Sequence, residues 1–270
     1  MRIVLLAAAY FGAMKAGGVA VPLPPGPRSD RLPAALADCS PRVVVVDDAT
    51  ARVLGPRGVF TGVPHVLAVA AAPLPAPFVD FVAAFGACDD TPLTHEGGDD
   101  NLAAIIYTSG STGEPRGVML SHGNFVANAQ SIVAYLHLTA ADRVMCVLPF
   151  SYVYGLSLLH THVAVGGSLV IENRSAFPNV VLTGMAEHKV TGFAGVPSTF
   201  ALMLHRSSLD EAQLPHLRYV TQAGGAMSPA KIDEWVSRGP DADFFVMYAA
   251  TEAAARLTYL APVDLTRKRG

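Results

Sequence analysis

Strand-like apolar segments alternate with helix-like segments along nearly the whole chain, and this alternation restricts the fold more than any other feature. The expected strands are residues 19–21, 42–47, 65–69, 102–107, 118–121, 144–148, 168–172, 190–194, 218–222 and 244–248. The expected helices are residues 3–17, 30–39, 78–87, 124–137, 156–165, 179–188, 197–205 and 229–237. Repeated strand–helix order is typical of parallel sheets covered by helices. We therefore expect an α/β fold with two lobes of mostly parallel sheet flanked by helices.

One expected strand, residues 102–107, runs directly into a segment dominated by Ser, Thr and Gly, residues 108–115. Glycine allows positive φ and close backbone approach, and clustered hydroxyl and backbone N–H donors suit phosphate oxygens. The segment does not match three known motifs. These are the nucleotide-binding loop GxxxxGK followed by Ser or Thr, the dinucleotide-binding fingerprint GxGxxG, and the hydrolase nucleophile elbow GxSxG. The alternative is a flexible Ser/Gly linker, which has a similar composition.

The segment 108–118, TSGSTGEPRGV, resembles the signature loop TSGSTGxPKGV of the adenylate-forming superfamily. That superfamily comprises acyl-CoA synthetases, adenylation domains of peptide synthetases, and luciferases. The resemblance implies a fold like the large N-terminal domain of those enzymes, and it assigns the β,γ-phosphates of ATP to Thr108, Ser109, Gly110, Ser111, Thr112 and Gly113. Arg116 stands where the family has Lys, which keeps the charge but presents a planar fork.

A second element, VMYAATE at 246–252, presents Tyr, Thr and Glu at the end of an expected strand, where ligands bind in open α/β sheets. It resembles the family's YGxTE. The resemblance implies that Tyr248 stacks on the adenine, Thr251 binds a phosphate oxygen and Glu252 binds Mg²⁺. A plain helix start with a first-turn Glu is the alternative. Ala249 replaces the family's Gly, which raises the question of backbone strain.

Three further elements resemble family motifs in the same order. TQAGGAMSP at 221–229 resembles the GGAPL element and implies that Gly224, Gly225 and Ala226 line the adenine and acyl sites. LPFSYVYGLS at 148–157 resembles LPxxHxxG, with Tyr152 in place of His at the acyl pocket. GVPST at 195–199 resembles GVPT and implies that Gly195, Val196 and Pro197 form the pocket floor. Glycine turns and a helix-starting proline are the alternatives.

The composition of the chain restricts the kinds of binding partner and the cellular location that we expect. The chain is 51% apolar with a formal net charge of −3, which gives no sign of a nucleic-acid or anionic-membrane partner. Its three cysteines show no CxxC or metal-ligand spacing, which indicates a reducing, cytoplasmic location. The uncharged stretch 144–171 is long enough to cross a bilayer. Prolines, glycines and histidines divide it, however, so we expect no membrane span.

The chemistry implied by the resemblance is attack of a carboxylate on the α-phosphate of Mg·ATP, which gives acyl-AMP and pyrophosphate. The acyl group then passes to a thiol, either coenzyme A or the phosphopantetheine of an acyl carrier protein. The lack of a visible Asp that would anchor an α-amino group favours a fatty or aryl acid. An amino-acid adenylation segment of a peptide synthetase is the alternative.

The resemblance spans about half of a family member's length. We expect residues 1–262 to form an adenylation core truncated at both ends, with lobes of about 1–140 and 141–262 and a tail at 263–270. The Asp that holds the ribose and the small C-terminal domain with its catalytic Lys are missing from this sequence. The isolated chain is therefore expected to bind ATP poorly and to turn over little, and a catalytically incompetent nucleotide-binding segment is the second alternative.

Overall fold

The strand-forming segments pair into three sheets in the computed structural model, which describes residues 2–24, 26, 31–89, 91–93, 97–108, 116–265 and 267. Contacts within the chain divide it into two units, Met1–His122 and Gly123–Gly270. Each unit has its own hydrophobic cluster and its own sheet. The two lobes of the expected fold class are thus found.

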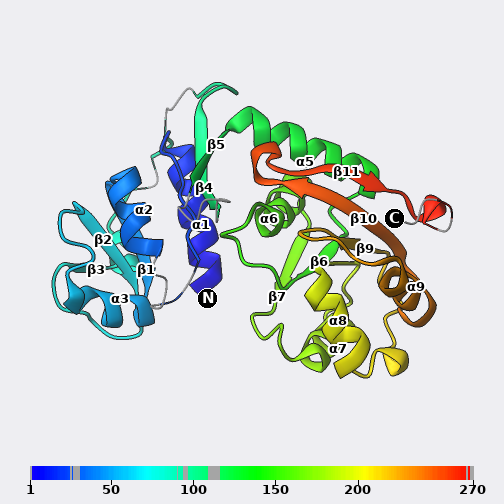
Figure 1. Ribbon diagram of the computed structural model, residues 1–270. Coiled ribbons are helices and arrows are strands. Elements are labelled where there is room, and N and C mark those ends of the chain that lie inside the picture. The colour runs from blue at the N-terminus through cyan, green and yellow to red at the C-terminus, as the bar shows by residue number, and fades with distance from the viewer. Residues whose placement is uncertain are drawn as a thin grey trace. The chain divides into compact units, whose positions relative to one another are not determined.

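The first unit contains a three-stranded parallel sheet and a separate hairpin. Strands β1 (Val43–Asp47), β2 (His65–Val69) and β3 (Phe78–Asp80) pair in that order. Helices α1 (Arg2–Lys15), α2 (Arg31–Cys39), α3 (Asp48–Leu54) and α4 (Phe81–Gly86) belong to the same unit (Figure 1). Asp47 and Asp80 begin α3 and α4, because each carboxylate accepts a backbone N–H in the first turn.

The hairpin of the first unit is antiparallel and consists of β4 (Leu102–Thr108) and β5 (Arg116–Ser121). Ala20 joins it through a parallel bridge to Ala104, with backbone hydrogen bonds of 2.9 and 3.0 Å. The hairpin ends at Thr108 and Arg116, which are paired residues. The expected strands at 102–107 and 118–121 therefore form the hairpin, whereas the strand expected at 19–21 is reduced to the single bridge at Ala20.

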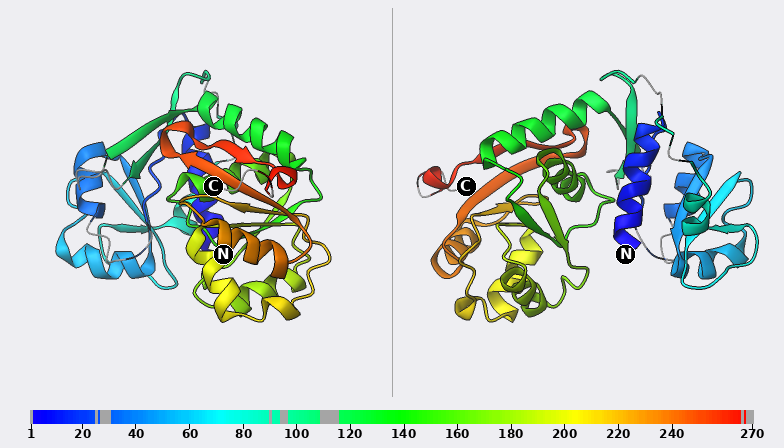
Figure 2. Two further views of the ribbon diagram at one scale, coloured as in Figure 1. Left: turned by 45° about the vertical axis from the view of Figure 1, so that its right-hand side comes forward. Right: turned by 180° about the vertical axis from the view of Figure 1, so that it is seen from behind.

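The second unit is built on a six-stranded sheet with the order β11-β10-β9-β8-β6-β7. Its strands are β6 (Arg143–Cys146), β7 (Ser168–Ile171), β8 (Gly192–Gly195), β9 (Tyr219–Gln222), β10 (Asp243–Ala250) and β11 (Ala255–Leu260). All of them pair in parallel except β11, which is antiparallel to β10 (Figure 2). The chain passes from β6 to β7 on one side and then returns to β8 on the other side of β6. The strand order therefore reverses between β6 and β8, the kind of position at which open α/β sheets bind ligands.

Helices cover both faces of this sheet (Figure 1). On one face α7 (Pro178–Glu187), α8 (Pro197–Arg206) and α9 (Pro229–Arg238) pack on Met145, Phe193, Val220 and Phe244. On the other face α5 (His122–Leu136) and α6 (Val153–Val165) pack on Val144, Cys146, Ala194, Tyr219 and Met247. Successive strand residues thus contribute to opposite clusters, as the two-residue period of a strand requires.

The chain passes from the first compact unit to the second at the start of α5. Helix α5 belongs with the second unit because Ile132 and Leu136 are buried in its cluster. In addition, the Asn128 side chain donates hydrogen bonds to the carbonyl oxygens of Ala253 and Arg256, at 3.3 and 2.8 Å. The extent of the complete domain stays a prediction.

Several expected elements need correction. The helix expected at 78–87 begins with strand β3, because Asp80 in an extended conformation caps the helix only from Phe81 onward. Helix α3 was not expected, and neither was β11. The β4–β5 hairpin and the β10–β11 edge are antiparallel, so the sheets are mostly rather than wholly parallel.

The uncharged stretch 144–171 is divided among β6, α6 and β7, as expected. Among the described residues, no helix has the length and apolarity needed to cross a membrane.

Candidate functional site

In the first unit, the donor-rich segment connects the two strands of a hairpin. Thr108 ends β4 and is half-buried, whereas Arg116 begins β5 and is exposed. The Thr108 hydroxyl lies 3.5 Å from the carbonyl oxygen of Arg116. Ser109, Gly110, Ser111, Thr112 and Gly113 lie outside the described residues, so their assignment to phosphates stays a prediction.

In the second unit, the carboxyl ends of the parallel strands β6, β8, β9 and β10 lie at one edge of the sheet. The strand pairing shows this alignment, because Cys146 pairs with Ala194, Gly195 pairs with Gln222, and Gln222 pairs with Val246. Four of the predicted elements follow these strand ends. They supply Tyr152, Gly195–Pro197, Gly224–Ala226 and the segment from Tyr248 to Glu252.

The turn after β9 packs against the start of α8. Gly224 has a φ of +82°, and a Cβ atom there would lie 3.1 Å from Cγ1 of Val196. A Cβ on Gly225 would lie 3.4 Å from Cγ of Pro197. The Gln222 amide donates a hydrogen bond of 2.8 Å to the carbonyl oxygen of Gly225 and holds the turn. The turn therefore needs glycine at position 224, and it leaves the backbone of residues 224–226 exposed.

The loop after β6 contacts the same strand ends. Tyr152 precedes α6 in an extended conformation and is 51% exposed, so its ring is available to a ligand. The Tyr154 hydroxyl is 2.9 Å from both the carbonyl oxygen and the Oγ1 atom of Thr221. Burial raises the pKa of Tyr154 to about 12, so this phenol stays protonated at neutral pH.

The hairpin β10–β11 carries the remaining predicted residues. Tyr248 is 65% exposed. Thr251 is half-buried and Glu252 is exposed, and these two residues belong to one 3-10 turn, η3 (Thr251–Ala253). Positive φ occurs at Ala254 and Ala255 but not at Ala249, which lies in β10. The Ala249 replacement therefore leaves the strand unstrained, and the strained positions come after the turn.

Pairing in this hairpin is irregular. Tyr248 pairs with Thr258 and Ala249 pairs with Arg256, so Leu257 has no opposite residue in the ladder. This β-bulge places Ala255 and Arg256, two successive residues, in buried positions, whereas Leu257 is 53% exposed.

Sequence inspection missed Arg256, Tyr135 and Tyr154. The Arg256 guanidinium donates a hydrogen bond of 2.9 Å from Nη1 to the Tyr135 hydroxyl and lies 5.4 Å from the ring centroid of Tyr154. The signal for Arg256 was present, since it is the one charged residue in the segment 253–263, AAARLTYLAPV. Nothing in the sequence marked Tyr135, because its role depends on the packing of α5 over β11.

The HxH pair at 160 and 162 does not form a metal site. His162 is buried, with Nδ1 2.9 Å from the carbonyl oxygen of Leu158 and Nε2 3.1 Å from the Tyr219 hydroxyl. Burial lowers the pKa of His162 to about 4. Throughout the part of the chain that the structure describes, no three His, Cys, Asp or Glu side chains are placed to hold a metal ion.

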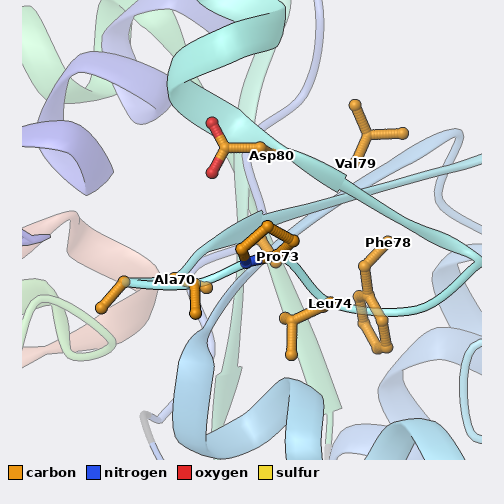
Figure 3. Close-up of a pocket in the computed structure, with 9 residues that line it drawn as sticks. Ala70, Pro73, Leu74, Phe78, Val79 and Asp80 are labelled. Atoms are coloured by element: carbon orange, nitrogen blue, oxygen red, sulfur yellow. The ribbon is translucent and has the colours of Figure 1, made fainter.

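A shallow hollow of about 320 Å³ lies in the first unit, between the end of β2 and β3 (Figure 3). Its lining is mostly Ala, Pro, Leu, Val and Phe, and Asp80 is its one titratable residue. The Asp80 carboxylate already accepts the backbone N–H of Ala83 as the cap of α4. The hollow therefore lacks convergent polar groups and is a weaker candidate than the strand ends of the second unit.

Comparisons with known proteins identify the family of this chain. The sequence model of a family described as AMP-binding enzyme matches residues 2–270. Indoleacetate–CoA ligase of Aromatoleum aromaticum is 28% identical over 97% of this chain and 51% of its own length. The nonribosomal peptide synthetase vlms of a Lecanicillium species is 27% identical over 94% of this chain and 3% of its own length.

Solved structures match as well. The structure of ATP-bound MatB from Rhodopseudomonas palustris superposes with a TM-score of 0.82 and 26% identity, covering 96% of this chain and 50% of that one. The chain thus spans about half or less of the length of the relatives named here.

Proposed function

Because the chain belongs to the AMP-binding enzyme family, we propose that it takes part in ATP-dependent activation of a carboxylic acid. A carboxylate oxygen of the acid attacks the α-phosphorus of ATP, the bond from that phosphorus to pyrophosphate breaks, and acyl-AMP forms. A thiol then attacks the acyl carbon and AMP leaves. The thiol belongs to coenzyme A or to the phosphopantetheine of an acyl carrier protein.

The observation that carries the proposal is the meeting of four sequence elements at the carboxyl edge of one parallel sheet. Gly195–Pro197 and Gly224–Ala226 pack on each other there, and β10 adds Tyr248 at the same edge. Exposed backbone beside an exposed aromatic ring suits a planar base, which stacks on the ring and lies against the turn. We assign the adenine of ATP to Tyr248 and to the turn of residues 224–226.

The phosphates are assigned to hydroxyl, backbone and cationic groups. Thr251 offers its hydroxyl to the α-phosphate, and Arg116 offers a guanidinium to the β,γ-phosphates together with residues 108–113. Positioning and charge neutralisation provide most of the catalysis in such transfers, because the protein itself forms no covalent bond.

Mg²⁺ fits this donor set. Glu252 offers an exposed carboxylate, and Mg²⁺ is commonly bound by one or two carboxylates together with the phosphates of a substrate. When bound, Mg²⁺ neutralises charge on the phosphate oxygens. Glu252 would hold it beside Thr251 in the same 3-10 turn.

The acid is assigned to the apolar surface around Tyr152 and Gly195–Pro197. A fatty or aryl acid suits those side chains, and an amino acid is the alternative that the peptide-synthetase relative supports. The buried guanidinium of Arg256, however, argues against an acid that is apolar throughout.

Calorimetric titration tests the proposal, with ATP and with non-hydrolysable acyl-sulfamoyl adenosines as ligands. We expect the acyl-AMP mimic to bind more tightly than ATP, and Thr251→Ala and Glu252→Gln to weaken binding. Glu187→Gln, an exposed change at the end of α7, is the matched control and should have no effect. Binding of ATP without the mimic would support a nucleotide-binding segment without acid activation. No binding of either ligand would remove the proposal.

A further inference from the structure

A positive charge is buried in the second unit, and no carboxylate among the described residues compensates it. Arg256 is 7% exposed, and none of the ion pairs among the described residues includes it. Its guanidinium contacts two phenols, Tyr135 through Nη1 and Tyr154 through the ring face. A phenol hydroxyl and an aromatic face lower the cost of burying a cation, but neither supplies an opposite charge.

The two nitrogens without a partner lie on the same side of the guanidinium. Nε and Nη2 of Arg256 are buried and have no hydrogen-bond partner among the described residues. Nε–H and Nη2–H form the side-on fork of arginine, which matches the two oxygens of a carboxylate. A buried unsatisfied donor costs free energy, and here two donors and a charge coincide.

The same chain shows how this fork is filled elsewhere. Arg174 uses Nε and Nη2 to bind the two carboxylate oxygens of Glu172 at 2.9 and 2.8 Å. Arg238 binds both oxygens of Asp210 in the same manner, at 3.0 and 2.9 Å. Arg256 presents the identical pair of nitrogens, with its third nitrogen held by Tyr135, but the described part of the chain places no carboxylate on them.

The position of Arg256 connects it with the proposed acid site. It follows Thr251 and Glu252 in the same hairpin and pairs with Ala249, next to Tyr248. Its guanidinium lies over the ring of Tyr154, which is two residues from Tyr152 and is hydrogen-bonded to Thr221 at the end of β9. Two other buried polar atoms of this edge, Ser151 Oγ and Gln222 Oε1, also have no hydrogen-bond partner among the described residues.

We propose that Nε and Nη2 of Arg256 bind a second carboxylate on the substrate, so that the acid activated here is a dicarboxylic acid. One carboxylate is then free to attack ATP while the other is held by the fork and neutralises the buried charge. This inference rests on the proposed function, because it assigns the substrate class of that same site.

The test uses paired acyl-sulfamoyl adenosines of equal chain length whose far end is either a carboxylate or a methyl group. The pairs cover acyl chains of about four to eight carbons, and calorimetry on the purified chain measures their affinities. For at least one length we expect the carboxylate-ended compound to bind about tenfold or more tightly than its partner. Arg256→Met should remove that preference and leave binding of the methyl-ended compound intact.

Two further variants keep the result interpretable. Arg256→Lys retains the charge without the fork and should show a reduced preference, which also provides a readout if Arg256→Met does not fold. Arg238→Met, which changes a surface arginine whose fork is already filled by Asp210, should keep the full preference.

The outcomes separate the two proposals. Equal binding of both compounds at every length, or a preference that persists in Arg256→Met, would overturn the dicarboxylic acid while the proposed activation stands. Failure of both series to bind would remove the proposed function and this inference with it.

Discussion

Thr108 and Arg116 are paired residues of the β4–β5 ladder, so strand pairing brings together the two ends of the segment that is proposed to bind phosphate. A loop closed by a hairpin loses less entropy on ordering than a free linker of the same composition. The ends of the segment are thus fixed by pairing, whereas residues 109–115 between them lie outside the described residues and the choice between phosphate loop and linker stays a prediction.

Gly117 is a position of this hairpin where added volume meets the facing strand. A Cβ atom there would lie 2.6 Å from Cγ2 of Ile105, which belongs to the facing strand and is β-branched. We expect Gly117→Ala to destabilise the chain by about 1–3 kcal/mol and to weaken ATP binding, because the ladder has to shift. Thermal unfolding and calorimetry measure both effects. Met119→Ala, at a 69% exposed position of the same strand, is the control, and an equal effect there would contradict the steric cause.

Arg116 provides a second test of the phosphate assignment. Its guanidinium is exposed at the start of β5, so Arg116→Ala should weaken ATP binding by about 1–2 kcal/mol with little change in stability. Arg116→Lys, the residue of the family motif, should restore most of the affinity. Arg52→Ala removes an exposed arginine that is paired with Asp48 and should leave ATP affinity unchanged. Unchanged affinity in Arg116→Ala would contradict the assignment.

Arg256 should reduce the stability of the ligand-free chain. Replacing a buried, incompletely paired ion with an apolar side chain of similar volume often stabilises a protein, here by about 1–4 kcal/mol for Arg256→Met. Replacing Arg218 should change the stability in the opposite direction, because Arg218 is paired at 2.8 Å with the buried carboxylate of Asp142. Arg218→Met should destabilise the chain by about 1–3 kcal/mol, since it leaves that carboxylate without its cation. Denaturant unfolding of both variants measures the contrast, and destabilisation by Arg256→Met would argue for an internal role.

The buried His162 makes stability depend on pH. Its pKa is about 4 in the folded chain because burial disfavours the imidazolium, whereas the unfolded chain titrates near the ordinary value of about 6.5. Between these values the unfolded chain binds more protons, so the free energy of unfolding falls as the pH is lowered from about 6.5 to about 4. The full loss from this residue is about 3 kcal/mol. Unfolding of His162→Gln across this range should show a shallower slope, while the exposed His65→Gln should match the parent chain.

His137 ends α5 with a φ of +51°, a conformation that glycine adopts at lower cost. We expect His137→Gly to stabilise the chain by about 0.5–1 kcal/mol, because the side chain is exposed and loses little packing. His137→Ala removes the imidazole but keeps the unfavourable conformation and should bring no gain. A shift in melting temperature measures the difference, and equal effects of Gly and Ala would exclude the backbone explanation.

The order of strands and helices was predictable because it depends on local patterns. The run Val43–Asp47 is β-branched at four positions, and α8 begins at Pro197 as its sequence indicated. Two features were not predictable in this way. The antiparallel pairing of β11 depends on its long-range contact with β10, and the start of α4 depends on the capping conformation of Asp80.

In the candidate site, too, some features follow from local sequence and others depend on long-range contacts. The place of Tyr248, Thr251 and Glu252 at and just after the end of β10 was predictable from a motif, because it follows from chain order, and their roles stay a prediction. Arg256 acquires its surroundings from α5 and α6, whose Tyr135 and Tyr154 are 121 residues and about 100 residues away in the chain. Contacts of that sequence separation leave no local pattern.

The bulge at Leu257 determines which side chain of β11 faces α5 and α6. If the bulge were absent and the pairing continued without a skipped residue, Leu257 would pair with Ala249. Arg256 would then lie on the other face of the sheet. The side chain of β11 that faces α5 and α6 beside Ala249 would then be the aliphatic Leu257 in place of the charged Arg256. Under the proposed function, the identity of the side chain facing the acid would therefore depend on the register of this hairpin as well as on its residues.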